Sequence, residues 1–401
     1  MLNIRVLDDI EELRALSTEW SALLQRSASN GPTLSPGWLL PWWDLFGQTD
    51  NRQLKTVVLR DGPRLVGLAP LSLRRCTRGR YRGLHRLELL GSGEDEADAI
   101  ASDYIGVIAE TGAEQAVAKA MAELLAGAAL GEWDDAMFDA MNGGELLPQL
   151  LAREAAALGM HVTAEMAGAS PYIVLPDSWD EYLATLTALR RGSLKRTLQR
   201  FERWAGRDHY LRRATSPKDL SEGFRILVDL HAARWSKTGQ PGVFASRRFS
   251  TFHEIVMPWL LQMGTLDLSW LCVRDEPVAA SYSIIWNGKV HFYQGGRSLQ
   301  VPASVRPGLV LHANNIRAAI AAGLHEYDFL GGISRYKIEL STATRPLMRV
   351  RIVHPSVRTN LLQVAGMVRR QLRAVAAHPR SHPISGRVMR AMLRRRTAAR
   401  R

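Results

Sequence analysis

The sequence predicts an α/β (α+β) protein of two related units, each a mixed, mainly antiparallel sheet flanked by helices, followed by a basic tail. Strand-like and helical apolar runs alternate through most of the 401 residues. The segment VLRDGPRLVGLAPLSL at 58–73 is similar to CVRDEPVAASYSII at 272–285, since each pairs two apolar runs around an Arg-Asp turn. We therefore place the domains at 1–168 and 169–355 and the tail at 356–401.

The first half is expected to combine short strands with amphipathic helices. Apolar residues at helical spacing follow Asp8 and Asp9, either of which could cap the first helix. Two apolar runs flank Asp61-Gly62-Pro63, which predicts a β-hairpin. Further strands are expected at 86–91, 102–108 and 133–140, and helices at 113–130 and 145–158.

The second half begins with helices and continues with an antiparallel meander. Ser178 can open a helix that leads into a strongly basic helix at 190–203, and another helix is expected at 217–235. Three strand-like runs follow, LDLSWLCVR, PVAASYSIIW and KVHFYQGG. A helix that begins near Pro307 and a short strand, EYDFLGG, complete the unit.

The net charge of +13 belongs to the tail. No acidic residue follows Glu339, whereas fifteen arginines lie between Arg345 and Arg401; subtracting these from the 52 basic residues leaves 37 against 39 acidic ones. Basic amphipathic segments suit an anionic membrane surface and, as the less favoured partner, nucleic acid. A tail without structure is the alternative.

The remaining composition excludes several classes of protein. It is ordinary for a globular chain, which excludes collagen-like and disulfide-scaffold proteins. Cys76 and Cys272 form no CxxC pair, and the N-terminal segment is acidic, so we expect a cytoplasmic protein without a signal peptide, with peripheral membrane contact through the tail. The histidines form no HExxH and no ligand spacing with a cysteine, so no metal site is expected, and no GxSxG motif indicates a serine hydrolase.

Several blocks together resemble GNAT-superfamily acetyltransferases of the CelD type, which accompany cellulose and exopolysaccharide synthesis and are related in fold to FemAB-like transferases. They are SDYIGV at 102–107, PYIVLP at 171–176, the basic helix at 190–203, LHAARW at 230–235 and the stretch 291–337. The resemblance covers roughly residues 10–355. It implies two GNAT-like domains, acetyl-CoA or another acyl-CoA as co-substrate, and an acceptor amino group on a polysaccharide, amino-sugar or glycolipid precursor.

The donor site implied by the resemblance lies where a central strand, a helix start and a splayed strand follow one another. VHFYQGG, the helix at Pro307 and EYDFLGG fit these parts in order. Helix-start N–H groups attract phosphate, Gly308 lies among them, and Arg297 and Arg306 could add charge-assisted bonds. The usual loop R/Q-x-x-G-x-G/A is not spelled out before Leu309. A FemAB-like transferase that uses aminoacyl-tRNA, or a helix without a ligand, therefore stays an alternative.

Three residues are candidates for the chemistry. Asp328 lies in an apolar strand, where a carboxylate is costly unless it is paired or functional. Tyr336 and Lys337 follow it closely; the carboxylate could act as general base on an amine, and either neighbour could protonate the departing group. The alternative is a structural Asp328–Lys337 ion pair. Asp103 carries the same two alternatives, and we expect it to approach a shared cleft from the first domain.

Other side chains could line an acceptor pocket. His231 shares a helix face with Arg234 and Trp235, at spacings of three and four residues, although a partly buried helix surface would give the same pattern. Tyr293 alternates with Phe292 along a strand, so one of them points toward the cleft.

The basic helix at 190–203 could hold an anion. Arg196 and Arg200 share a face of it, which could receive a nucleotide-linked sugar, a lipid pyrophosphate or tRNA, or could simply be solvated. A third, non-enzymatic hypothesis is an accessory protein that works through the tail on a membrane or nucleic acid.

Overall fold

The first half folds around a small antiparallel sheet and a helical layer. The computed structural model describes residues 2–48, 50–77, 82–237 and 239–354, so the expectations for the tail lie outside the described residues. The small sheet has the order β1-β3-β4-β7 and contains the predicted hairpin. Its strands are β1 (Asn3–Leu7), β3 (Thr56–Asp61), β4 (Arg64–Ala69) and β7 (Ile108–Ala109).

The helices of this half begin near the residues that the sequence indicates. Asp9 caps α1, because its carboxylate accepts the Glu11 N–H at 2.9 Å. The prediction at 102–108 needs a correction: residues 102–107 form a loop, since Tyr104 and the preceding Ala101 adopt positive φ, and Ile108 alone belongs to a strand, β7. The helices are α1 (Ile10–Ala15), α2 (Ser17–Gln25), α3 (Pro36–Phe46), α4 (Glu114–Ala126) and α5 (Leu146–Ala157), with 3₁₀ turns at Pro32–Leu34 and Glu96–Asp98.

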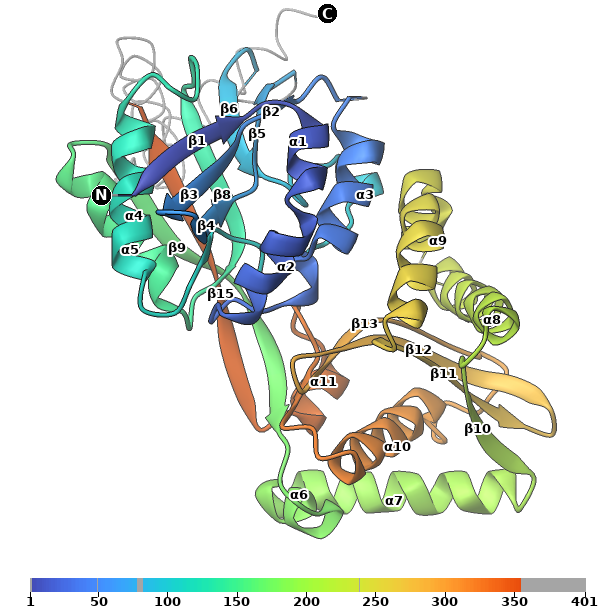
Figure 1. Ribbon diagram of the computed structural model, residues 1–401. Helices are drawn as coiled ribbons and strands as arrows, with labels where there is room; N and C mark the ends of the chain where they lie inside the picture. Colours follow the sequence, from blue (N-terminus) through green and yellow to red (C-terminus); the bar gives the residue numbers. More distant parts are fainter. Residues whose placement is uncertain (1, 49, 78–81, 238, 355–401) are drawn as a thin grey trace, which may run out of the picture. The chain divides into compact units, whose positions relative to one another are not determined.

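A second, eleven-stranded sheet runs through both halves of the sequence (Figure 1). Its order is β10-β11-β12-β13-β14-β9-β15-β8-β6-β5-β2. Its strands are β2 (Gln53–Leu54), β5 (Leu71–Arg75), β6 (His85–Leu89), β8 (Asp135–Asn142), β9 (His161–Val174), β10 (His209–Arg213), β11 (Leu266–Val273), β12 (Glu276–Trp286), β13 (Lys289–Arg297), β14 (Glu326–Asp328) and β15 (Ala343–Val353).

Strands β9 and β15 connect the two halves. They pair antiparallel from Ala343↔Tyr172 to Val353↔His161, and β15 then pairs with β8 on its other side. The expected domain boundary at 168/169 falls inside β9. The end of the second half therefore returns to the first half, which the local sequence pattern does not reveal.

The helices of the second half cover the large sheet. Ser178 caps α6 as predicted, and Ser216 caps α8, which begins at the predicted residue, Pro217. The sequence pattern missed α9 and α11. The helices are α6 (Trp179–Thr185), α7 (Ala188–Ala205), α8 (Pro217–Ser236), α9 (Arg247–Gln262), α10 (Pro307–Ala321) and α11 (Arg335–Leu340), with a 3₁₀ turn at Val243–Ala245.

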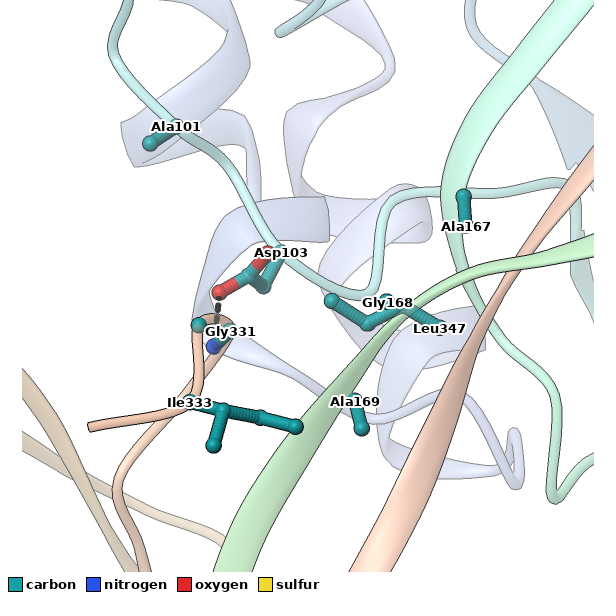
Figure 2. A pocket seen from close by; sticks show the side chains of 9 residues that line it. Ala101, Asp103, Ala167, Gly168, Ala169, Gly331, Ile333 and Leu347 are labelled. Carbon is teal, nitrogen blue, oxygen red and sulfur yellow. Dashed lines mark hydrogen bonds between the residues drawn. The ribbon is translucent and has the colours of Figure 1, made fainter. Parts of the chain in front are cut away.

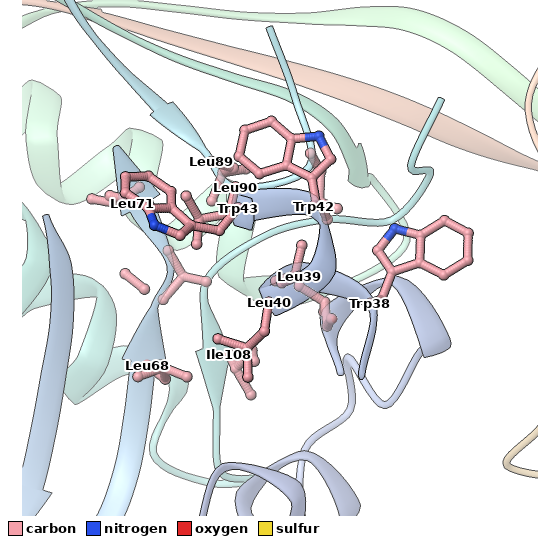
Figure 3. Packing of buried hydrophobic residues seen from close by; sticks show 14 of the residues in the cluster. Trp38, Leu39, Leu40, Trp42, Trp43, Leu68, Leu71, Leu89, Leu90 and Ile108 are labelled. Atoms are coloured by element: carbon pink, nitrogen blue, oxygen red, sulfur yellow. The ribbon is translucent and has the colours of Figure 1, made fainter. Parts of the chain in front are cut away.

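A tryptophan-rich core links the halves and fixes the loop at 100–104. Trp38 and Trp42 of α3 are fully buried, and Figure 3 shows them among leucines of the neighbouring elements. Trp38 packs edge-on against Phe252 of α9, with ring centroids 4.9 Å apart, and its indole donates to the Ser102 hydroxyl at 2.9 Å. The loop is therefore held by a core to which both halves contribute. No helix in the described ranges is long and apolar enough to cross a bilayer.

The packing of α8 on β13 depends on a glycine. A Cβ added to Gly296 would lie 2.6 Å from the His231 backbone nitrogen, whereas a Cβ at Gly308 would meet no atom within 4 Å. We expect Gly296→Ala to lower the free energy of unfolding by about 1–3 kcal/mol, because backbone must move away from backbone. Gly308→Ala, the matched control, should leave it unchanged or raise it slightly. Chemical denaturation measures both, and equal stability of the two variants would contradict this account.

Candidate active site

A pocket of about 410 Å³ lies between the 101–104 loop, strand β9 and the turn after β14 (Figure 2). Its lining is mostly small and apolar, and Asp103 is its charged member among the described residues. The lining residues are Ala101, Asp103, Ala167, Gly168, Ala169, Gly331, Gly332, Ile333 and Leu347. The sequence analysis selected Asp103 from this set.

The pocket exists because β14 is short. It pairs with β9 only over Tyr172–Val174, and one further bond joins the Phe329 N–H to the Pro171 carbonyl at 3.0 Å. The chain then turns away through positive φ at Leu330 and Gly332. Space beside the adjoining part of β9 is left open as a result.

Asp103 faces this space with a carboxylate that is held from one side. Its Oδ2 accepts the Gly331 N–H at 2.6 Å, drawn as a dashed line in Figure 2. The Thr33 hydroxyl donates to the Asp103 backbone carbonyl at 2.7 Å. Burial raises the pKa of Asp103 to about 6, and the negative charge of Asp328 adds to the rise while the Gly331 N–H opposes it. Such a carboxylate is ionised at neutral pH and basic enough to accept a proton.

Asp328 does not line the pocket. Its side chain is 0% exposed. Its Oδ1 accepts the Leu330 N–H at 2.7 Å, and its Oδ2 accepts the Tyr104 hydroxyl at 2.8 Å and an Arg345 N–H at 2.6 Å. Its ion partner is therefore Arg345, and the alternative of an Asp328–Lys337 pair is wrong. Asp328 holds the turn that presents the Gly331 N–H to Asp103.

The sequence analysis missed Arg345. Its guanidinium also donates to Glu326 at 2.8 Å and lies over the rings of Tyr104 and Tyr172, at 5.4 and 4.4 Å from their centroids. Pairing of β15 with β9 places it there. An arginine in a strand-like run at the start of an arginine-rich segment carries no local signal for such a role.

Lys337 and Tyr336 lie on α11 beside the same turn. The Lys337 ammonium donates to the carbonyls of Leu330 and Gly331, at 3.2 and 2.7 Å. Burial lowers the pKa of Lys337 to about 8, against the attraction of the two aspartates. Tyr336 stacks on buried His312 with centroids 5.2 Å apart, and burial raises the pKa of Tyr336 to about 12.

The four remaining acceptor candidates lie away from the pocket lining. His231 is 2% exposed, and its Nε2 accepts the Trp235 indole N–H at 2.9 Å. Burial lowers the pKa of His231 to about 4, so it is neutral at pH 7. Arg234 is exposed and lies over the Trp235 ring, 5.6 Å from its centroid. The half-buried Tyr293 donates its hydroxyl to the Ile100 carbonyl, the residue before the pocket-lining loop segment.

The expected donor region has the predicted order of parts. Strands β13 and β14 pair in parallel over three residues, up to His291↔Asp328, and then separate. Helix α10 begins at Pro307, but Arg306 has positive φ and pairs with Glu339 at 2.5 Å. The Leu309 N–H donates to the Arg306 carbonyl at 2.9 Å, so this amide of the first turn is already used. Gly308 and Arg297 lie at the helix start and at the end of β13.

The basic helix α7 is a solvated cationic surface next to that region. Lys195, Arg196, Arg200 and Arg203 are exposed, and none of them forms an ion pair with a described residue. Arg200 donates to the Ser304 carbonyl at 3.3 Å, in the loop before α10. Within the described ranges, no group of three histidine, cysteine or acidic side chains could hold a metal ion.

Comparison with known proteins identifies the fold class. Residues 189–338 match the model of an acetyltransferase (GNAT) domain. FemX has a similar structure, with a TM-score of 0.55 at 11% identity over 87% of this chain and 98% of FemX. A conserved protein of unknown function from Bacteroides thetaiotaomicron VPI-5482 gives 0.50 at 14% identity, over 88% of this chain and all of that one, 100%. No curated protein matches the sequence.

These findings define a GNAT-type acyltransferase fold. The predicted α/β class is confirmed: mixed sheets are flanked by helices, and residues 189–338 match the model of a GNAT acetyltransferase domain. At identities this low the two structural likenesses show the fold alone. The CelD-type specificity stays a prediction.

The buried charges around Arg345 should dominate local stability. We expect Arg345→Met to lower the free energy of unfolding by about 3–5 kcal/mol, because it leaves Asp328 without its cation and Glu326 with Lys289 alone, at 3.6 Å. Arg349→Met is the matched control on the same strand: that arginine also has two acidic partners but is 37% exposed, and its loss should cost at most about 1 kcal/mol. Thermal or urea unfolding compares the free energies of unfolding of the two variants. Similar decreases would show that the buried Arg345 pairs contribute no more to stability than the exposed Arg349 pairs.

Proposed function

We propose that this protein is an N-acyltransferase. Its acceptor is a primary amine of the substrate, which binds in the pocket beside the Asp103 carboxylate. The observation that carries the proposal is a half-buried carboxylate of raised pKa that lines a pocket in a GNAT-type fold, beside a lysine whose pKa is lowered to about 8. A base and an acid whose pKa values lie on either side of neutrality suit a reaction that removes a proton from an amine and returns one to a leaving group.

The proposal gives Asp103, Asp328 and Lys337 different roles, as general base, positioning residue and general acid. Asp103 takes the proton from the ammonium group of the acceptor, because its carboxylate opens on the pocket. Asp328 is a positioning residue, since it is fully buried and holds both the Leu330–Gly331 turn and Tyr104, the residue after Asp103. Lys337 ends at that turn and can return a proton, as can Tyr336, the second candidate acid.

The order of β13, α10 and β14 and the arginines near the α10 start suit an acyl-CoA donor. When bound, it supplies an acyl group activated as a thioester. Arg306, Arg297 and the Gly308 N–H would hold its phosphates at the α10 start, provided that Arg306 exchanges Glu339 for phosphate. The exposed Arg196 and Arg200 of α7 are a further source of positive charge, and Arg200 contacts the loop before α10. Acetyl-CoA is the simplest such donor.

The acceptor suggested by the CelD-type resemblance is an amino group of a polysaccharide, amino-sugar or glycolipid precursor. His231, Arg234, Trp235 and Tyr293 are retained as candidate contacts for it. In this proposal the basic tail would bring the protein to the inner face of an anionic membrane. The unpaired cations of α7 favour a second candidate, a transferase that uses aminoacyl-tRNA.

The pH dependence of turnover tests the acid and base. We expect kcat/KM to rise with pH through about 6, where Asp103 ionises, and to fall above about 8, where Lys337 loses its proton. Asp103→Asn and Lys337→Met should each reduce turnover by about 10²–10⁴-fold and remove the acidic and the alkaline limb respectively.

Stability separates a catalytic Asp103 from a structural one. Its folded pKa of about 6 lies above the ordinary value near 4, so the stability it contributes is present below about pH 4 and is lost as the pH rises through about 6. Asp103→Asn should therefore be as stable as the wild type at pH 7.5, or more so. An inactive variant that is also strongly destabilised would indicate a structural role.

Coenzyme A binding tests the donor. We expect coenzyme A to raise the melting temperature. At a concentration 100 times its dissociation constant, it should raise the free energy of unfolding by about 2.7 kcal/mol. Arg306→Glu should weaken this response, and Glu339→Gln should strengthen it because it releases Arg306. Protection by charged tRNA at raised ionic strength, with no response to millimolar coenzyme A, would instead support the aminoacyl-tRNA candidate.

A further inference from the structure

Strand β9 has one unpaired edge in the middle of the large sheet. On one side, β15 pairs with it along its length. On the other side, β14 reaches only Tyr172–Val174, and the Phe329 N–H adds one bond to Pro171. In the part of the chain that the structure describes, no strand pairs with residues 161–170 on this side.

This edge is accessible. Residues 163–168 are all exposed, and Met166 is 77% exposed. Ala164, Ala167 and Gly168 are small, so their side chains do not cover the main chain. In an antiparallel pair, alternate residues direct their N–H and C=O groups away from the partner strand. An uncovered row of such groups is a template for another extended chain.

The unpaired edge leads into the pocket. Ala167, Gly168 and Ala169 belong both to the edge and to the pocket lining, as Figure 2 shows. The pocket lies where β14 would continue along β9 if the chain did not turn away at Leu330. A ligand strand on this edge can therefore continue the direction of β14, antiparallel to β9, with its first residue beside Asp103.

The chemistry of the pocket favours the terminal amine of such a strand. An α-amino group has a pKa of about 7.7–8.0, whereas that of a lysine side chain is about 10.4. A carboxylate of pKa about 6 removes a proton from the α-amine with far less free energy. Ile333, 69% exposed and part of the lining, offers apolar contact to the first side chain.

We propose that the acceptor is an extended peptide that adds as a strand to the β9 edge at residues 163–169 and presents its N-terminal amine to Asp103. This inference rests on the proposed function and names its acceptor class, in place of the glycan that the resemblance suggests, because a glycan has no regular row of amides to pair with the edge. Asp103 takes one proton from the terminal ammonium group, the neutral nitrogen bonds to the acyl carbon of the thioester donor, and the carbon–sulfur bond breaks. The leaving thiolate takes a proton from Lys337, the second nitrogen proton is lost to Lys337 as the amide forms, and Asp103 releases its proton to solvent.

The experiment measures docking separately from transfer. The probe is a mixture of amidated heptapeptides that begin with a free alanine and are randomised thereafter; its control is the same mixture with alternate backbone nitrogens methylated, which removes donors and leaves the amine. Hydrogen exchange reports the amides of residues 163–169 in the full-length protein, and radiolabelled acetyl-CoA reports transfer. We expect the unmethylated mixture to slow exchange there and to be acetylated at least tenfold faster than the methylated one.

Variants at one position test whether the main chain makes the contact. Ala169 lies two residues before Pro171, whose carbonyl accepts the Phe329 N–H on the β14 side, so the Ala169 N–H points to the unpaired edge. Ala169→Pro removes this N–H and should weaken the protection, whereas Ala169→Ser keeps the N–H and should retain the protection. Asp103→Asn should retain protection and lose transfer. If Ala169→Pro does not fold, the difference between the two peptide mixtures on the wild type still tests strand addition.

The results distinguish this inference from the function on which it rests. If a glucosamine oligomer is acetylated while neither peptide mixture slows exchange at 163–169, the acceptor assignment is wrong and the N-acyltransferase function stands. Equal protection by the methylated and unmethylated mixtures would also overturn strand addition. If the unmethylated mixture protects the edge but no amine is acylated with any donor, docking stands and the proposed function fails.

Discussion

The site depends on one cation placed between two buried carboxylates. Arg345 reaches Asp328 and Glu326 with separate nitrogens and is enclosed by the rings of Tyr104 and Tyr172. Without it, Asp328 would carry an uncompensated negative charge in the interior and Glu326 would keep only its longer pair with Lys289, at 3.6 Å; an unpaired buried charge is among the costlier arrangements in a protein. Burial raises the pKa of Asp328 and the Arg345 charge opposes this rise, while the Asp328 carboxylate accepts the Leu330 N–H and the Tyr104 hydroxyl. The turn after β14 and the loop that carries Asp103, which both line the pocket, are thus fixed to the same carboxylate.

This arrangement gives the two aspartates different roles. Both carboxylate oxygens of Asp328 accept hydrogen bonds and its side chain has no exposed surface, so Asp328 fixes the position of the turn and does not contact a ligand. Asp103 is bound through the Gly331 N–H and opens on the pocket, so it can exchange a proton with a ligand. A Cβ on Gly331 would lie 2.9 Å from both Asp103 carboxylate oxygens, which shows how closely the turn approaches the carboxylate. The positive φ of Ala101, Tyr104 and Leu330 is concentrated around the same point.

The length of β14 links this network to ligand access. The Leu330 N–H donates to the Asp328 carboxylate, and Leu330 adopts positive φ. The chain therefore turns away from β9 immediately after β14. The same bond therefore ends β14, opens the pocket and leaves the β9 edge unpaired. Strands β13 and β14 separate after the pair His291↔Asp328, where the proposed donor would lie, so the end of β14 borders both the pocket and the point where the two strands separate.

Local sequence determined much of this protein. Periodicity and caps such as Asp9 and Ser178 predicted most helices, and Asp61-Gly62-Pro63 predicted the β3–β4 hairpin, because these features depend on neighbours within a few residues. Asp328 in its short strand and Asp103 were likewise selected from sequence, although the segment around Asp103 is a loop and not the predicted strand. Only the tertiary structure paired Asp328 with Arg345, made Asp103 the residue that faces the pocket, and buried His231. The physical reason is that β15 returns across the chain to pair with β9, and the partners of a buried charge are set by that long-range pairing and by desolvation, neither of which is written in local sequence.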